Sequence, residues 1–337
     1  MTPPEPGADD TIRILPTAAR RRSRAPLAAI AVAALVALLA AGGVGWLLWP
    51  HPAPIPRPQP PAPVAAVPAQ PSAFQLETAT EHQILDHIAA GLTVFQFAAN
   101  PRILVLDFAS LHEQGLMLDR VAALVEKAGL PRDRVLTDAE LAAAISASGD
   151  TIDTYYYGHD YPAAALAQFF ALADQEHIAL NPQEERLRAL LQQVGWFAPG
   201  ALGGLISLPA VASDPKVTIL ARAAILRHEL SHGEFFSDPN YASYVHNFWL
   251  TELTDQERAG VRAFLAKEDY DASKEELMYN EMQAYLMFTR DPMFFTPGMV
   301  GLTPARLAEL QARFLAGMPA GWLHDVLAGY QSTSAAR

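Results

Sequence analysis

The stretch AILRHELSHGEFFSDP (residues 224–239) places His228 and His232 four positions apart, with Glu229 directly after the first histidine. On a helix, side chains four apart lie on one face, so both imidazoles can reach a common ion. Glu229 is rotated by about 100° from His228 and can flank that ion without binding it. Two neutral nitrogen ligands beside a carboxylate base are typical of a hydrolytic zinc site. The alternative is a pair of histidines that pack or cap a helix end.

The surroundings of the two histidines favour metal binding. Residues 216–232 predict a helix that is apolar nearly all round, as in a helix buried at the centre of a domain. Asp214 is the expected N-cap, Pro215 fits the first turn, and Gly233 fits just past the C-terminal end. Two unpaired imidazoles and a carboxylate would be costly inside such a helix unless they bind a partner.

A catalytic zinc also needs a third protein ligand and an open position for water. Asp238 follows His232 by six residues, but a role as N-cap of the next helix explains it without any metal. Glu281 is the other candidate. It lies on a predicted helix that opens with a capping box of Ser273 and Glu276, and apolar residues surround it on the inner face. A carboxylate there is out of place unless it is paired or bound to metal, which favours Glu281.

The two motifs together resemble those of the gluzincin metallopeptidases. The resemblance spans residues 200–290 and is carried by His228-Glu229-Leu230-Ser231-His232 and by Asn280, Glu281 and Ala284. It implies an α+β fold that is mostly helical, with a zincin-like metallopeptidase core. In that core two helices face each other across zinc, and a short edge strand upstream aligns the peptide substrate.

The resemblance also implies a role for each matched residue. His228, His232 and Glu281 would bind Zn²⁺, and Glu229 would be the catalytic general base. The run GLISLP (204–209) would be the edge strand that aligns the substrate. Zinc would lower the pKa of its bound water and polarise the scissile carbonyl, while the base takes the proton of the water and passes it to the leaving amine.

One position departs from the gluzincin pattern. Many members carry an aspartate four residues after the ligand glutamate, where it orients the first histidine, and this chain has Tyr285 there. A phenol accepts an imidazole N–H less strongly than a carboxylate does. Asn280 and Tyr285 are therefore the expected neighbours that support the metal ligands, and Glu276 is an alternative acid for that role.

The sequence does not single out the group that stabilises the oxyanion. The candidate donors are Tyr241, Tyr244, His246, Tyr279 and Arg290, and for any one of them a surface or packing role is the simpler explanation. The stretch DTIDTYYYGHDYP (150–162) is rich in aromatic and polar groups, and it either lines a pocket or packs against the body of the domain.

Composition limits the kinds of partner. The 337 residues include no cysteine, which excludes disulfides and thiolate zinc sites. The net charge is −12, and residues 73–337 carry about −15 because the six basic and three acidic side chains of the first 72 residues lie outside them. A body this acidic is a poor binder of nucleic acid, because affinity there comes from cations on phosphates.

Residues 27–49 predict a membrane-spanning helix. They carry no charge, and 23 helical residues span roughly 34 Å, enough for a bilayer core of about 30 Å. Arginines cluster before this segment, so the N-terminus is expected in the cytoplasm and the soluble part in the periplasm, with a single pass through the inner membrane. A cleaved signal peptide is the alternative, but the apolar run is long for one.

Five segments follow from these patterns. They are a basic cytoplasmic tail (1–25), the transmembrane helix (26–49), a proline-rich linker (50–72), a helical N-terminal part of the soluble region (73–199) and a zincin-like metal-binding region (200–337). Ten of the residues in 50–72 are proline, which predicts an extended tether.

The sequence thus predicts a membrane-anchored, extracytoplasmic zinc metallopeptidase that acts on a peptide or protein of the cell envelope. Two alternatives stay open. The first is a non-catalytic, zincin-like binding protein in which zinc is structural or lost. The second is an envelope scaffold whose histidines are spaced by chance.

Overall fold

A mixed sheet of five strands and a predominantly helical remainder make up residues 73–335, the part of the chain that the computed structural model describes. The strands are β1 (Leu76–Ala79), β2 (Thr93–Phe97), β3 (Ile103–Phe108), β4 (Asp160–Pro162) and β5 (Gly204–Pro209). Their order across the sheet is β1-β2-β3-β5-β4. The pairs β1–β2 and β3–β5 are parallel, and the pairs β2–β3 and β5–β4 are antiparallel.

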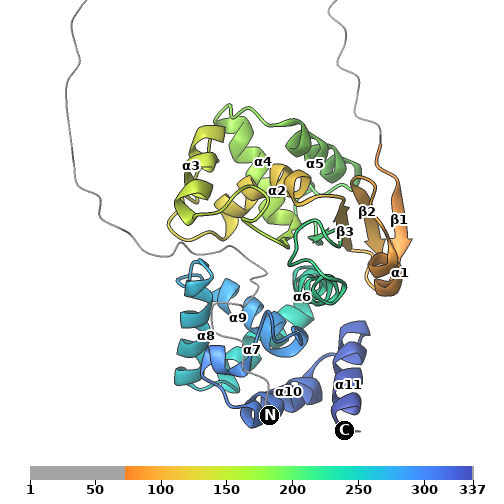
Figure 1. The fold of residues 1–337 in the computed structure, drawn as a ribbon, viewed down its shortest axis with the longest axis vertical. Coiled ribbons are helices and arrows are strands. Elements are labelled where there is room, and N and C mark those ends of the chain that lie inside the picture. Colours follow the sequence, from red (N-terminus) through yellow and green to blue (C-terminus); the bar gives the residue numbers. More distant parts are fainter. Residues whose placement is uncertain (1–72, 336–337) are drawn as a thin grey trace, which may run out of the picture. The chain divides into compact units, whose positions relative to one another are not determined.

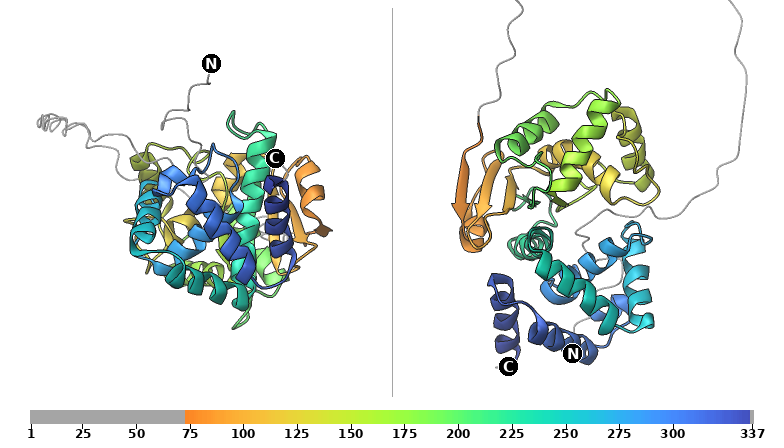
Figure 2. Two further views of the ribbon diagram at one scale, coloured as in Figure 1. Left: turned by 90° about the horizontal axis from the view of Figure 1, so that it is seen from below. Right: turned by 180° about the vertical axis from the view of Figure 1, so that it is seen from behind.

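The helices lie in two groups on either side of one long helix, α6 (Ile219–Ser237) (Figure 1). The first group, which lies with the sheet, contains α1 (Glu81–Asp86), α2 (Leu111–Val125), α3 (Asp138–Ser148), α4 (Ala163–Gln175) and α5 (Pro182–Gln193). The second contains α7 (Pro239–Thr251), α8 (Asp255–Lys267), α9 (Glu275–Gln283), the π-helix η1 (Ala284–Phe288), the 3₁₀-helix η2 (Pro297–Val300), α10 (Pro304–Gly317) and α11 (Trp322–Ala335). Figure 2 shows the same division from behind.

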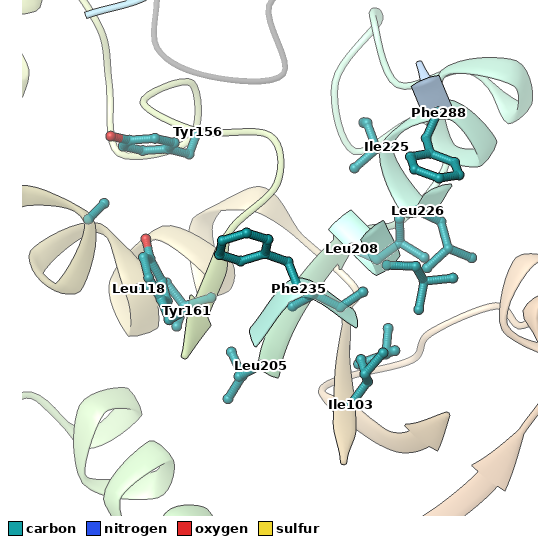
Figure 3. Close-up of a cluster of buried hydrophobic side chains, with 14 of the residues drawn as sticks. Ile103, Leu118, Tyr156, Tyr161, Leu205, Leu208, Ile225, Leu226, Phe235 and Phe288 are labelled. Atoms are coloured by element: carbon teal, nitrogen blue, oxygen red, sulfur yellow. The ribbon is translucent and has the colours of Figure 1, made fainter. Parts of the chain in front are cut away.

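Every residue of β3 and of β5 is buried, and both strands are mostly apolar. Ile225 and Leu226 of α6 belong to the same buried apolar cluster as Leu205 and Leu208 of β5 (Figure 3).

A backbone contact and a buried ion pair hold α6 against the sheet. A Cβ atom on Gly204 of β5 would lie 2.8 Å from the Cα of Gly233, so the two backbones touch because neither residue has a side chain. Near the other end of the helix, the buried Arg222 donates two hydrogen bonds to Asp107 of β3, at 2.9 and 3.1 Å. The same guanidinium donates to the carbonyls of Ile84 and Pro209. A buried ion pair with this many partners strongly restricts where the helix can lie.

The predicted start and end of α6 are wrong. Thr218, not Asp214, is the N-cap, and its hydroxyl accepts a hydrogen bond from the amide of Ala221 at 3.1 Å. Asp214 instead closes a turn by accepting from the amide of Lys216. Gly233 lies inside the helix, where an added Cβ atom would lie 2.8 Å from the side chain of Ile103 on β3.

The predicted fold class is wrong in its edge strand. GLISLP forms β5, which is hydrogen-bonded to β3 on one side and to β4 on the other. The edge strand near α6 is β4, only three residues long and within the aromatic stretch 150–162. Residues 73–199 also contribute four strands where mainly helices were predicted.

The predicted transmembrane helix, which was part of the fold class, and the predicted inner-membrane location also need correction. Among residues 73–335, no helix combines the length and the apolar character needed to cross a bilayer. The predicted spanning segment 27–49 and the proline-rich linker 50–72 lie outside the described residues.

Substituting Gly204 tests the contact between α6 and β5. Gly204→Ala forces a methyl group against the backbone of Gly233, so the free energy of unfolding should fall by about 1–3 kcal/mol. Gly91→Ala is the control, because no atom lies within 4 Å of its added Cβ, and it should change that free energy by less than about 1 kcal/mol. Urea unfolding followed by circular dichroism measures both; equal effects would contradict the backbone contact.

Candidate metal site

Helices α6 and α9 bring the three predicted ligands together. His228 and His232 lie one turn apart on α6, and their Nε2 atoms are 3.1 Å apart. The Oε2 atom of Glu281, on α9, lies 3.6 Å from Nε2 of His228 and 3.7 Å from Nε2 of His232. At most 1% of the surface of each residue is exposed. These groups are close enough to bind one metal ion.

The hydrogen bonds around His228 fix its tautomer. The hydroxyl of Thr289 donates to the carbonyl of Ala284 at 3.0 Å, so it has no proton left for the imidazole. It must therefore accept from Nδ1–H of His228, at 2.9 Å. Nε2 of His228 then carries a lone pair that faces His232 and Glu281, which is the state a metal ligand requires.

The π-helix η1 explains how Thr289 reaches His228. Directly after α9 the backbone hydrogen bonds join residues five apart instead of four. The amide of Thr289 therefore donates to the carbonyl of Ala284. π-helical turns inside helices are rare and are frequently found at functional sites. This turn places Thr289, eight residues after Glu281, at the position from which it supports the first histidine.

Tyr285 does not take the role expected of it. Its ring packs edge-on against His228, with the ring centroids 4.6 Å apart and an interplanar angle of 71°. The phenol therefore contributes a packing contact, while Thr289 accepts the imidazole N–H. Asn280 does lie beside a predicted ligand, since its side chain forms a polar contact with His232.

Glu229 flanks the ligand cluster, as its rotation around the helix predicts. It is buried, and its Oε2 atom has no hydrogen-bond partner among the described residues. Gly158 makes room for it, because a Cβ atom there would lie 2.1 Å from Oε1 of Glu229. Asp160 of β4 approaches from the same side, with Oδ1 3.8 Å from Nδ1 of His232. Asp160, Glu229 and His232 are also close enough together to hold a cation.

Four buried carboxyl groups share this space: Glu126, Asp160, Glu229 and Glu281. Burial raises the pKa of every one, and the charge of Glu281 raises the pKa of the other three further. The pKa of Glu126 reaches about 8. Burial also lowers the pKa of the neighbouring Lys127 to about 8, and its ammonium lies 3.5 Å from Asp269. Four carboxyl groups thus share this space with Lys127, which already pairs with Asp269. A metal cation would stabilise the ionised carboxyl groups.

The two imidazoles are suited to the same partner. Burial lowers the pKa of His228 to about 3 and that of His232 to about 4. Both are neutral at pH 7, and neutral imidazole is the form that binds metals. Both oxygens of Glu281 lack a hydrogen-bond partner among the described residues. The Tyr270 hydroxyl approaches this carboxyl group and moderates the rise in its pKa, but without good hydrogen-bond geometry.

The structure gives other roles to the remaining candidates. Asp238 is the N-cap of α7 and accepts from the amide of Asn240 at 2.8 Å. The hydroxyl of Tyr241 donates to the side chain of Gln283, and the hydroxyl of Tyr244 donates to the carbonyl of Phe314. Arg290 donates to the side chain of Gln311. His246 and Tyr279 stack on each other and line a surface pocket.

Sequence reasoning missed Glu126, Tyr270 and Thr289, and it gave Asp160 only as one member of an aromatic stretch. Glu126 ends α2, and Tyr270 lies in the loop before α9, so neither belongs to a helical motif. An isolated bridge between Lys127 and Tyr270 joins their two segments. The sequence signal that could have revealed Glu126 and Tyr270 is the presence of an acid and a tyrosine among otherwise apolar residues.

No protein-family model matches the chain, and neither the curated proteins nor the solved structures include a significant match.

Removing the hydroxyl of Thr289 should weaken metal binding. Thr289→Val leaves Nδ1–H of His228 without its acceptor, and losing such a support typically reduces metal affinity by about 10- to 100-fold. Thr289→Ser retains the hydroxyl and should bind almost as well as the unchanged chain. Competition with a chromogenic chelator measures the affinities. Equal affinity in the valine and serine variants would show that Thr289 does not orient the histidine.

Metal binding should stabilise the fold, and Glu281 should be required. A metal ion that binds only the folded state adds about 2.7 kcal/mol when its concentration is 100 times Kd. Glu281→Gln should lose this gain in a thermal unfolding experiment. Asp238→Asn keeps the helix cap and should retain the gain. The opposite pattern would make Asp238 the third ligand.

Proposed function

We propose that this chain is a zinc-dependent peptidase that uses gluzincin-type chemistry. The observation that supports it best is the triangle of ligand atoms from His228, His232 and Glu281, with sides of 3.1, 3.6 and 3.7 Å. Ligand atoms held about 2.0–2.1 Å from zinc at tetrahedral angles lie about 3.3 Å apart. Two imidazoles and one carboxylate are also the ligand set of zinc peptidases that leave a fourth position for water.

Within this proposal, Glu229 is the general base. It follows a ligand on the same helix, and its Oε2 atom is free of hydrogen bonds within the described residues, so it can accept a proton from water. Burial first, and then the charges of Glu281 and Glu126, raise the pKa of Glu229. A raised pKa is a common property of carboxyl groups that act as acid or base in catalysis. When bound, zinc would supply the acidified water and polarise the carbonyl of the substrate.

The edge strand β4 takes the place that the resemblance gives to a substrate strand. It is the outermost strand beside α6, and its first residue, Asp160, lies next to His232. An extended peptide binds a sheet by adding at an edge, which β5 does not offer because strands flank it on both sides. We therefore place the peptide substrate along β4.

A second candidate function is metal binding without catalysis, and the burial of the site favours it. His228, Glu229, His232 and Glu281 are almost entirely enclosed, as in structural metal sites, which are closed to substrate. A non-catalytic metal-binding protein would use the same metal ligands as the proposed peptidase but would hydrolyse no peptide. The two are separated by activity measured on protein of known metal content.

Glu229→Gln tests the peptidase. Glutamine has nearly the same size as glutamate but cannot take a proton, so hydrolysis of a fluorogenic peptide library should fall by about 10²- to 10⁴-fold. The zinc content should stay the same, because Glu229 is not one of the three ligands. Turnover equal to that of the unchanged chain would exclude Glu229 as the base. Full zinc occupancy with no turnover in either protein would favour the non-catalytic candidate.

A further inference from the structure

A surface pocket of about 320 Å³ lies beside the candidate metal site. It is lined by residues of α6, α7, α9 and the end of β4, and its size is near the lower end of the roughly 300–1,000 Å³ typical of ligand pockets. Phe236 connects the pocket to the site, because its ring stacks on that of His232 with the centroids 6.3 Å apart and an interplanar angle of 21°. Three of the elements that line the pocket, α6, α9 and β4, also carry the candidate ligand cluster.

The lining of this pocket is aromatic and carries one carboxylate. Tyr279 and His246 stack with their ring centroids 4.7 Å apart, and the Phe235 ring lies 5.8 Å from that of Tyr279. Glu276 supplies the carboxylate, and no lysine or arginine lines the pocket. Rings next to a carboxylate are the surroundings that favour a cationic side chain.

The groups near Glu276 leave its charge available. The predicted capping box with Ser273 does not form: Ser273 donates to Asp271, and α9 begins without a side-chain cap. Lys274 interacts electrostatically with Glu276, but its ammonium donates a hydrogen bond to the carbonyl of Val125 at 2.6 Å. Arg262 pairs with the neighbouring Glu275.

We propose that this pocket selects a positively charged side chain, arginine or lysine, of a peptide that lies across the metal site. This inference rests on the proposed peptidase function and adds a substrate class to it. Glu276 pairs with the cation, the stacked rings of Tyr279 and His246 hold its apolar stem and planar head, and Phe236 separates the cation from the metal ligand His232. The acidic charge of the body, about −15 over residues 73–337, favours the approach of such peptides.

Binding is tested first, because it needs no turnover. The probes are Nα-acetyl-arginine amide, Nα-acetyl-lysine amide and the uncharged Nα-acetyl-norleucine amide, titrated into the full chain by calorimetry. The two cationic probes should bind roughly tenfold more tightly than the norleucine probe, and Glu276→Gln should reduce this ratio to about twofold. Glu185→Gln is the control, because it removes the same charge from α5 on the other side of α6 and should leave the ratio unchanged (Figure 1).

Hydrolysis then separates this inference from the proposed function. The zinc-loaded chain should have a higher kcat/KM for peptides with arginine than with norleucine beside the scissile bond, and Glu276→Gln should remove that preference. Selective binding without hydrolysis of any peptide would overturn the peptidase and leave the cationic pocket standing. Hydrolysis with no preference, or equal binding of all probes by the unchanged chain and by Glu276→Gln, would overturn the pocket.

Discussion

The direct contact between α6 and β5 is the constraint on which the candidate site depends. Gly204 and Gly233 let the two backbones touch, and Gly233 follows His232 immediately. A Cβ atom added at Gly204 would meet the backbone of Gly233, and one added at Gly233 would meet the side chain of Ile103 on β3. With the helix in place, β4 pairs with β5 at the same level and carries Asp160 to within 3.8 Å of His232. Backbone packing thus sets the distance between the imidazoles and the carboxyl groups of the sheet.

The site concentrates charge where the fold offers little solvation. Four carboxyl groups are buried together, and burial is the first cause of the raised pKa of each. Groups of this kind reduce stability unless a cation or a shared proton offsets them. Burial also lowers the pKa of both imidazoles, although the charge of Glu281 acts in the opposite direction on His232. The oxygens of Glu281 lack hydrogen bonds within the described part of the chain. A cation bound among these carboxyl groups would offset the cost of burying them.

Local signals made part of this arrangement predictable from the sequence. The four-residue spacing places His228 and His232 on one face, and the misfit of Glu281 among apolar neighbours identified it as their partner before any fold was known. The rest depends on long-range pairing. Nothing within GLISLP tells whether another strand covers its outer side, because β4 comes from a three-residue segment more than forty positions upstream. Similarly, the shift that brings Thr289 to His228 comes from a π-helical turn, which helical periodicity does not predict.

Phe236 lies between the candidate metal site and the pocket proposed to select a cationic side chain. Its ring stacks on His232 and also forms a wall of the pocket that contains Glu276. A cation in the pocket and a metal ion at the histidines would therefore lie on opposite sides of one aromatic ring, which keeps two positive charges apart while both remain near carboxylates. Because α9 carries both Glu276 and Glu281, the two negative charges are held at a fixed separation by one helix. A peptide whose cationic side chain fills the pocket would be positioned by the same helix that contributes the third metal ligand, so recognition and hydrolysis would depend on a single rigid element.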